Sequence, residues 1–439
     1  MNNKFNKLTL AAAITAAFAS QAHAGGYQIN EQSVSGQGYG HAGRSSNIND
    51  ASIVYGNPAG MSFLDRAQIT AGGTYLNVNS DIDNTTSSRS LETQAGPQPL
   101  GSVEGSNDGD MVPGTLVPFA FYAQPVNDQL AFGFGVYAPF GSKTEYEDGF
   151  QGRNQGNYTE VKVMTAQPTV SYRFNDQWAV GAGVTYNRVE GELRRQVPAA
   201  TPIGLTEVDS RVEGDDEAWG YNLGVIYQPV PETTLGLTYR SKVDFNLQGS
   251  FTASSPELDL LGIGTVTDTA ALDLTTPETV NFSLTQQMTD RLKLMFGASW
   301  ARWSHFDQIL VTGTDRPVIT NEPQSYENAW AFSTGGEYQL TPQLALRAGV
   351  ALDFTPTQDA TRSVRIPSDD RRIFSIGAGW SPTPDLTLDV AYSYLTERST
   401  QVNQTKTDDL LGTGAITSNY SADYKNEAHG FGAQLTYRF

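Results

Sequence analysis

A two-residue alternation of apolar and polar side chains constrains the fold of this chain more than any other feature. In the last block of the sequence, one face carries Phe431, Ala433, Leu435, Tyr437 and Phe439, and the residues between them are Gly, Gln, Thr and Arg. This period is that of a β-strand and not of a helix. Comparable blocks recur from residue 66 onward, so the chain is expected to be all-β.

The connections between these blocks alternate in length. Short turns rich in Asn, Asp and Pro lie at 124–129, 174–177, 228–233, 286–291, 340–343 and 381–385. Long polar connections lie at 80–113, 141–158, 190–217, 248–273, 307–325, 355–370 and 397–425. The blocks begin near 66, 114, 128, 159, 177, 218, 233, 277, 291, 326, 343, 371, 385 and 426. This pattern predicts a 14-stranded antiparallel transmembrane β-barrel over residues 66–439, since soluble β-sandwiches have shorter strands.

The first 24 residues have the pattern of a secretory signal peptide. Lys4 and Lys7 precede an apolar run over 8–19, which is too short to span a bilayer, and Ala22-His23-Ala24 is a small-residue cleavage site. The exported chain has no cysteine, so packing and hydrogen bonds must hold it together. The terminal Phe439 is the residue on which outer-membrane barrels usually end for recognition by the barrel assembly machinery. These features predict integration into the lipid of a bacterial outer membrane.

The charge balance argues against several classes of partner. The chain has 28 Lys and Arg against 47 Asp and Glu, a net charge of −19, which disfavours nucleic acid. The acidic stretches over 105–111 and 213–219 are interpreted as solvated loops and not as cation sites, so no metal or cofactor is expected.

The head of the exported chain, residues 25–65, does not alternate. It is rich in Gly, Ser, Asn and Ala, and it is too short and too polar to form a domain with its own core. Side chains fill the interior of a barrel of about eight strands, but not that of a barrel of 14. Residues 25–65 are therefore predicted to fill the barrel as a plug, and a disordered tail is the alternative.

The sequence resembles the FadL/TodX outer-membrane transporters of long-chain fatty acids and other hydrophobic compounds. Residues at the spacing of that family's hatch are Gly26, Gln28, Asn30, Glu31, Ser33, Ser35, Gly36, Gly38, Asn57, Pro58 and Ala59. Further matching segments are 237–245, 299–308, 362–380 and the C-terminus. The resemblance implies a monomeric 14-stranded barrel with an N-terminal hatch. It also implies loop capture of a lipid, an internal pocket, hatch rearrangement and lateral exit at a kinked third strand.

Three sets of residues are predicted to carry this transport. Gly133, Gly135 and Pro139 interrupt the third strand, where the wall could bend open, although Pro139 could simply end the strand. Strand parity places Arg240, Lys242, Arg347 and Arg371 on the inner face, as carboxylate ligands or as members of lumen ion pairs. The external capture groove is assigned to Phe140, Tyr146, Phe150, Leu193, Val197, Ile203 and Leu205, which could instead pack the loops closed.

Other functions remain open from the sequence. The same scaffold serves fatty acids and aromatic hydrocarbons, and a passive porin would need an open lumen. An outer-membrane lipase is disfavoured because no Ser lies in a G-x-S-x-G motif, so no enzymatic activity is expected.

Overall fold

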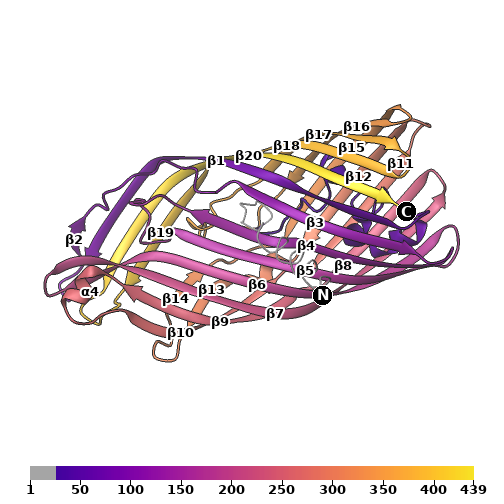
Figure 1. Ribbon diagram of the computed structural model, residues 1–439. Helices are drawn as coiled ribbons and strands as arrows, with labels where there is room; N and C mark the ends of the chain where they lie inside the picture. The colour runs from indigo at the N-terminus through magenta and orange to yellow at the C-terminus, as the bar shows by residue number, and fades with distance from the viewer. Residues whose placement is uncertain (1–25) are drawn as a thin grey trace, which may run out of the picture.

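The computed structural model describes residues 26–439, in which the strands form one closed antiparallel barrel (Figure 1). The predicted signal peptide lies outside the described residues. Strand β1 (Gln68–Leu91) closes the barrel by pairing with β20 (Ile416–Arg438) on one side and β3 (Thr115–Pro125) on the other. Among the described residues, no helix is long and apolar enough to cross a membrane.

The wall has 14 strand positions, as predicted. The other strands of the first half are β4 (Leu130–Glu145), β5 (Tyr158–Arg173), β6 (Trp178–Thr201), β7 (Gly204–Val230), β8 (Thr233–Arg240) and β9 (Val243–Ser254). Those of the second half are β10 (Val266–Thr276), β11 (Thr279–Gln287), β12 (Leu292–Ala301), β15 (Ala329–Thr341), β16 (Leu344–Asp353), β17 (Arg371–Thr383) and β18 (Leu386–Glu397). Strands β8 and β9 together occupy one position, and β10 and β11 occupy the next, because each pair is one strand broken near its middle.

Several predicted long loops are instead extensions of the barrel wall. Strands β6 and β7 pair without interruption from Trp178–Tyr227 to Thr201–Gly204, through the predicted loop 190–217. Short strands β2 (Gln98–Gly101), β13 (Gln308–Thr312), β14 (Thr320–Pro323) and β19 (Thr400–Asp408) and helix α4 (Pro256–Leu260) lie at the same end. Outside the bilayer the outer face of a strand needs no apolar side chains, so the loss of a lipid-facing apolar side wrongly predicted the loss of strand structure.

The outer face shows the membrane-facing band. Lipid-facing side chains such as Leu237, Phe282 and Ile376 are about half exposed in the isolated chain. Trp178 stacks on Tyr227 at the short-turn end, at a centroid distance of 4.2 Å, and Trp219 lies 5.2 Å from Tyr186 further along. Such aromatic pairs mark the two membrane interfaces, and this barrel class places the short turns in the periplasm.

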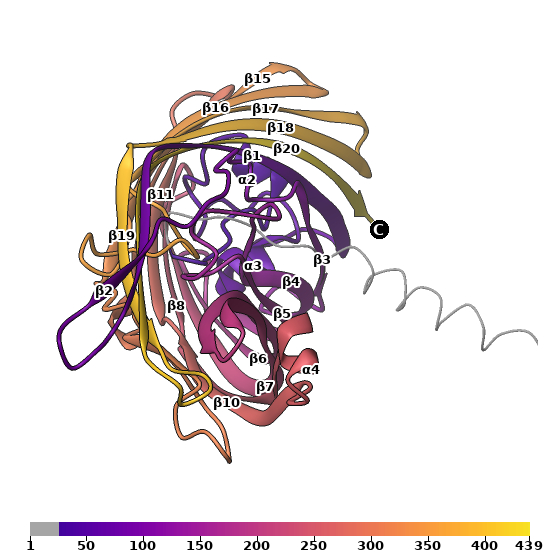
Figure 2. The ribbon, with the colours of Figure 1, turned by 90° about the vertical axis from the view of Figure 1, so that its left-hand side faces the viewer.

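Residues 26–64, which we call the plug segment, lie inside the ring of strands, as Figure 2 shows for α2 (Val34–Gln37) and α3 (Ile53–Gly56). The plug segment ends in a 3₁₀ helix, η1 (Pro58–Phe63). Asn57 caps η1 by accepting from the backbone N–H of Ala59, and its amide donates to the carbonyls of Ser45 and Val225. The Asn57-Pro58-Ala59 motif therefore joins η1 to the rest of the plug segment and to the wall.

Glycines on the inner face of the wall allow the plug segment to approach the strands closely. A Cβ atom on Gly236 would lie 1.8 Å from the carbonyl oxygen of Ser45. On Gly349 it would lie 2.1 Å from the carbonyl carbon of Tyr39, and on Gly335 it would lie 2.3 Å from the oxygen of that carbonyl. The plug backbone therefore occupies the space that side chains would fill elsewhere in a barrel.

We expect Gly335→Ala to loosen the plug segment, because the new methyl group would meet the backbone of Tyr39. An overpacking cost of about 1–3 kcal/mol predicts roughly 5- to 150-fold faster limited proteolysis within residues 26–64. The control is Gly336→Ala on the same strand, where the nearest atom is the flexible Cδ2 of Leu294, 3.0 Å away. Equal cleavage rates in both variants would contradict this role of the glycines.

Candidate functional site

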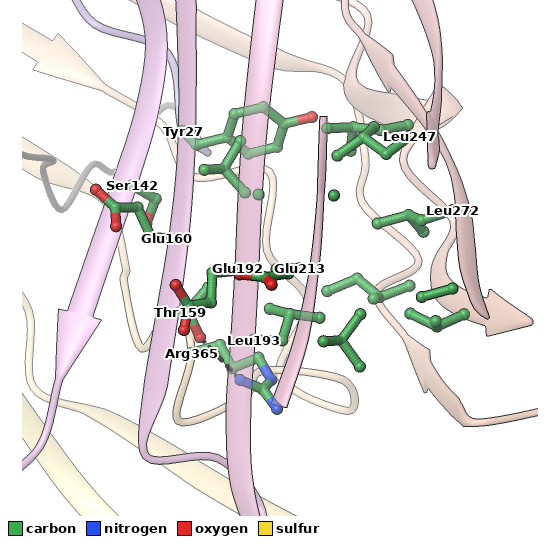
Figure 3. Close-up of a pocket in the computed structure, with 18 of the residues that line it drawn as sticks. Tyr27, Ser142, Thr159, Glu160, Glu192, Leu193, Glu213, Leu247, Leu272 and Arg365 are labelled. Carbon is green, nitrogen blue, oxygen red and sulfur yellow. Dashed lines mark hydrogen bonds between the residues drawn. The ribbon is translucent and has the colours of Figure 1, made fainter. Parts of the chain in front are cut away.

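An apolar pocket lies in the barrel between Tyr27 of the plug segment and Arg365 of the long connection before β17 (Figure 3). It contains about 760 Å³ of space that atoms do not fill, part of it open to solvent. Its apolar lining comes from four strands and the connection after β12: Leu193, Val212, Leu247, Leu272, Leu274, Phe306, Ile309 and Val311. A pocket of this size and lining suits a hydrophobic molecule.

The plug segment closes the inner end of this pocket through Tyr27. Its ring contacts three aromatic residues edge-on, with centroid distances of 4.7 Å to Trp303, 5.5 Å to Phe306 and 5.9 Å to Phe140. Tyr27 is 2% exposed, and burial raises the pKa of its hydroxyl well above the usual range. A ligand in the pocket would therefore rest on a side chain of the plug segment.

The β4 strand is irregular next to this contact. Its pairing with β3 stops at Tyr137, and its register with β5 shifts between Tyr137 and Phe140. The plug segment pairs with the irregular part: Ile29 N–H donates to the Pro139 carbonyl at 2.9 Å, and Gly141 N–H donates to the Tyr27 carbonyl at 2.8 Å. Pro139 thus lies within β4 at a bulge, where its missing N–H costs no ladder hydrogen bond.

The two glycines predicted to weaken β4 have specific neighbours. A Cβ on Gly133 would lie 2.3 Å from the sulfur of Met61 in η1, and a Cβ on Gly135 would lie 2.7 Å from the ring of Phe121 on β3. Gly133 therefore makes room for the plug segment, and Gly135 for a neighbouring strand.

Arg347 and Arg371 point inward as predicted, and both form buried ion pairs. Arg347 contacts Glu337 at 2.8 Å and also pairs with Asp389, while Arg371 contacts Glu397 at 2.7 Å. These contacts agree with the alternative prediction for Arg347 and Arg371, that they are members of ion pairs in the lumen. Each guanidinium already has a carboxylate partner in the closed barrel.

Arg240 also points inward, but its hydrogen-bond partners are neutral. It donates to the Tyr137 hydroxyl at 2.6 Å, and at 3.4 Å to the Gln167 amide oxygen and to the Tyr55 carbonyl. No carboxylate lies within 4.0 Å of its guanidinium nitrogens anywhere in residues 26–439.

The inward placement of Lys242 is wrong. Its side chain is 45% exposed and pairs with Asp244, whereas Val243 and Phe245 point into the barrel and are buried. The strand breaks between Arg240 and Val243, so the side chains of β9 have the opposite phase from those of β8. A parity count that runs through the break therefore gives the wrong face for Lys242.

The chain matches the family described as Outer membrane protein transport protein (OMPP1/FadL/TodX) over residues 15–439. The chain belongs to this family. It is 31% identical to outer membrane protein P1 of Haemophilus influenzae, over 99% of this chain and 100% of that protein. It is 27% identical to the long-chain fatty acid transport protein of Escherichia coli, over 99% of each chain.

Solved structures agree with this assignment. A FadL homologue of Pseudomonas aeruginosa superposes with a TM-score of 0.79 at 26% identity, over 94% of this chain and 99% of that chain. The toluene transporter TbuX of Ralstonia pickettii shares the fold, with a TM-score of 0.64 at 16% identity, over 92% and 97%. This FadL/TodX protein is therefore an integral outer-membrane barrel that transports hydrophobic compounds, and it is not an enzyme.

The residues predicted to form one capture groove lie in three places in this FadL/TodX barrel. Phe140, Leu193 and Val197 are buried, and Leu193 lines the pocket. Tyr146 and Phe150 stack at 3.8 Å in a separate cluster with Val364, Tyr420 and Tyr424. Ile203 and Leu205 are exposed near the tip of the β6–β7 hairpin. One groove containing all seven residues is therefore wrong, and Tyr146 and Phe150 pack their loop closed, which was the alternative.

Arg365 was not among the predicted site residues, although it lies in a segment that carries the family resemblance. Arg365 lines the pocket and contacts Glu322 at 3.0 Å, and Glu322 also pairs with Lys406. The two cations hold the pKa of the Glu322 carboxyl at about 2, against its desolvation. This ion cluster joins β14 and β19 to the loop before β17 above the pocket.

We expect Glu322→Gln to loosen these loops, because two buried cations would lose the carboxylate that they share. Breaking such a buried pair costs about 3–5 kcal/mol. Acid should act in the same direction: the stabilisation is present above pH 4.5 and is lost as the pH falls toward about 2. Hydrogen exchange over residues 320–323 and 400–408 checks both effects, and protection unchanged by the substitution would contradict them.

Proposed function

We propose that this protein takes up long-chain fatty acids, or closely related hydrophobic compounds, across the outer membrane. The protein acts as a monomer: the ligand enters from the long-loop end and binds in the apolar pocket of one barrel. Residues 25–65 then rearrange as a hatch, and the ligand leaves sideways through the wall near the β4 bulge. The supporting observation is that Tyr27 both closes the pocket and pairs with β4 beside Pro139. One plug residue thus contacts the candidate binding site and the candidate exit.

The free energy of transferring a lipid out of water favours a transport path lined by apolar side chains over a water-filled channel. A lipid with about fourteen methylenes gains roughly 11 kcal/mol on leaving water, at about 0.8 kcal/mol per CH₂. A water-filled channel would provide none of this free energy. The pocket supplies apolar surface, and lateral exit would deliver the chain to the outer-membrane lipid without crossing the polar plug region.

A fatty acid is preferred over an aromatic hydrocarbon because the relatives with the higher sequence identity include a long-chain fatty acid transport protein, while the toluene transporter TbuX is similar in fold alone. An elongated ligand also fits a pocket lined by successive strands from β6 to β10.

Competition binding tests this proposal. Purified protein is loaded with a fluorescent long-chain fatty acid and titrated with oleate, with a C18 alkane or with toluene. We expect displacement by oleate at concentrations at least about tenfold below those needed for toluene, because oleate buries more CH₂ groups. Displacement by toluene at the lower concentration would favour the aromatic-hydrocarbon transporter instead, and no binding of any of them would contradict the proposed function.

A further inference from the structure

The last three carbonyls of α3 each accept a hydrogen bond from a side chain of the wall. Gln167 donates to Val54 at 2.9 Å, and Thr238 donates to Gly56 at 2.8 Å. Between them, Arg240 donates to the carbonyl of Tyr55. The wall therefore caps the C-terminus of a plug helix, where backbone acceptors have no partner within the helix.

Arg240 is the charged member of this set. Its guanidinium carbon lies 4.7 Å from the centroid of the Tyr55 ring and 5.4 Å from that of Tyr137. Within the described chain, no carboxylate forms a salt bridge with it, unlike the inward-pointing Arg347 and Arg371 of β16 and β17. A partly buried cation that has only neutral partners would gain a stronger, charge-assisted hydrogen bond from an anion.

The same network reaches the β4 bulge. Tyr137 accepts from Arg240 and donates to Gln167 at 2.5 Å, and it is the last β4 residue that pairs with β3. Arg240 thus contacts both the plug segment and the strand position at which the wall loses a neighbour. We call Arg240, Tyr137, Gln167 and the Tyr55 carbonyl the Arg240 network.

The Arg240 network lies next to the inner end of the pocket. Phe140 follows Tyr137 across the bulge, Val243 follows Arg240 across the strand break, and both belong to the apolar cluster around Tyr27. A ligand that moves inward past Tyr27 would therefore approach Arg240.

We propose that Arg240 makes plug release specific for hydrophobic acids: a ligand carboxylate replaces the Tyr55 carbonyl and the Tyr137 hydroxyl as its partner. This inference rests on the proposed function and adds a requirement for the acid group. A carboxylate can accept two parallel, charge-assisted hydrogen bonds from a guanidinium, whereas an ester or a hydrocarbon cannot. The ligand thereby stabilises the state in which α3 and Tyr137 are no longer held, and it shifts the population toward that state.

The test uses the cysteine-free chain, into which two nitroxide labels are introduced by Asn49→Cys in the plug segment and Leu223→Cys on the lipid face. Electron–electron distances are measured with oleate and with methyl oleate, alongside the binding constants of both. We expect oleate to bind about tenfold more tightly and to broaden the distance distribution, while methyl oleate binds and leaves it unchanged. In Arg240→Met the two ligands should become equivalent in both measurements.

Thr238→Val is the matched control, since it removes the adjacent cap without removing a charge. It should loosen the plug segment equally with either ligand and keep the preference for the acid. If methyl oleate shifts the wild-type distances as oleate does, or if Arg240→Met keeps the preference, the role of Arg240 is overturned while the pocket assignment stands. If neither ligand binds the wild-type protein, both proposals fail. Should Arg240→Met not assemble, the wild-type comparison of acid and ester decides.

Discussion

Deleting residues 27–64 should convert this barrel from a nearly closed state into an open pore. The plug segment contacts the inner wall from many sides, for example at Gly236, Gly349 and Gly181, and 14 strands enclose a lumen that their own side chains do not fill. Single-channel recordings in planar bilayers should show small, rare openings for the full chain. The deleted chain should show steady currents about tenfold larger or more, as expected of a water-filled barrel.

The control for this experiment is assembly of the barrel itself. Pro58→Gly changes the first residue of η1 and keeps the plug segment, so it should leave assembly intact and lower ligand uptake. The heat-dependent mobility of each variant on gels reports whether the barrel is folded. A folded deletion variant without added conductance would show that residues 27–64 do not close the lumen.

Filling the pocket should abolish most ligand binding. Leu272 lines the pocket from β10, and replacing it with Trp adds a large ring to the space that the ligand would occupy. We expect Leu272→Trp to weaken binding of a long-chain fatty acid by about 10- to 100-fold, which corresponds to roughly 1.4–2.8 kcal/mol of lost apolar contact. Equilibrium binding of a fluorescent fatty acid measures the effect.

Leu346→Trp is the matched control for this substitution. Leu346 lies on β16 and is 42% exposed on the lipid face. A larger ring at this position would contact lipid and would not enter the pocket. Its binding should equal that of the unchanged chain. If Leu272→Trp binds the fatty acid as tightly as the unchanged chain does, the ligand does not bind in this pocket.

The wall of the barrel could be predicted from the sequence because lipid imposes a strict rule on each strand. A strand with one face in lipid must alternate, so Leu435 and Tyr437 reveal their orientation by their spacing. The rule ends where the bilayer ends. In the paired stretch from Arg188–Glu217 to Thr201–Gly204 the outer face is polar, while residues such as Val189 and Leu193 point inward, and its strands were predicted as a loop.

The candidate site could be predicted only in part, because it depends on irregularities. The break between Arg240 and Val243 reverses the phase of β9, so Lys242 points outward and Leu247 lines the pocket. The spacing hides this break: Val243, Phe245 and Leu247 continue the odd-numbered apolar positions of β8, where Leu237 faces lipid, although they point into the barrel. The pairing of Arg347 with Asp389 joins distant strands, and sequence spacing does not reveal it.

The central claim is that a hydrophobic ligand binds in the pocket above Tyr27. Photo-crosslinking with a diazirine-bearing long-chain fatty acid, followed by mass spectrometric mapping, tests it most directly. We predict adducts at pocket residues such as Leu193, Val212, Leu247 and Leu272, and their loss when excess oleate competes. Adducts confined to the Tyr146–Phe150 cluster or to the lipid-facing surface, unaffected by oleate, would contradict the claim.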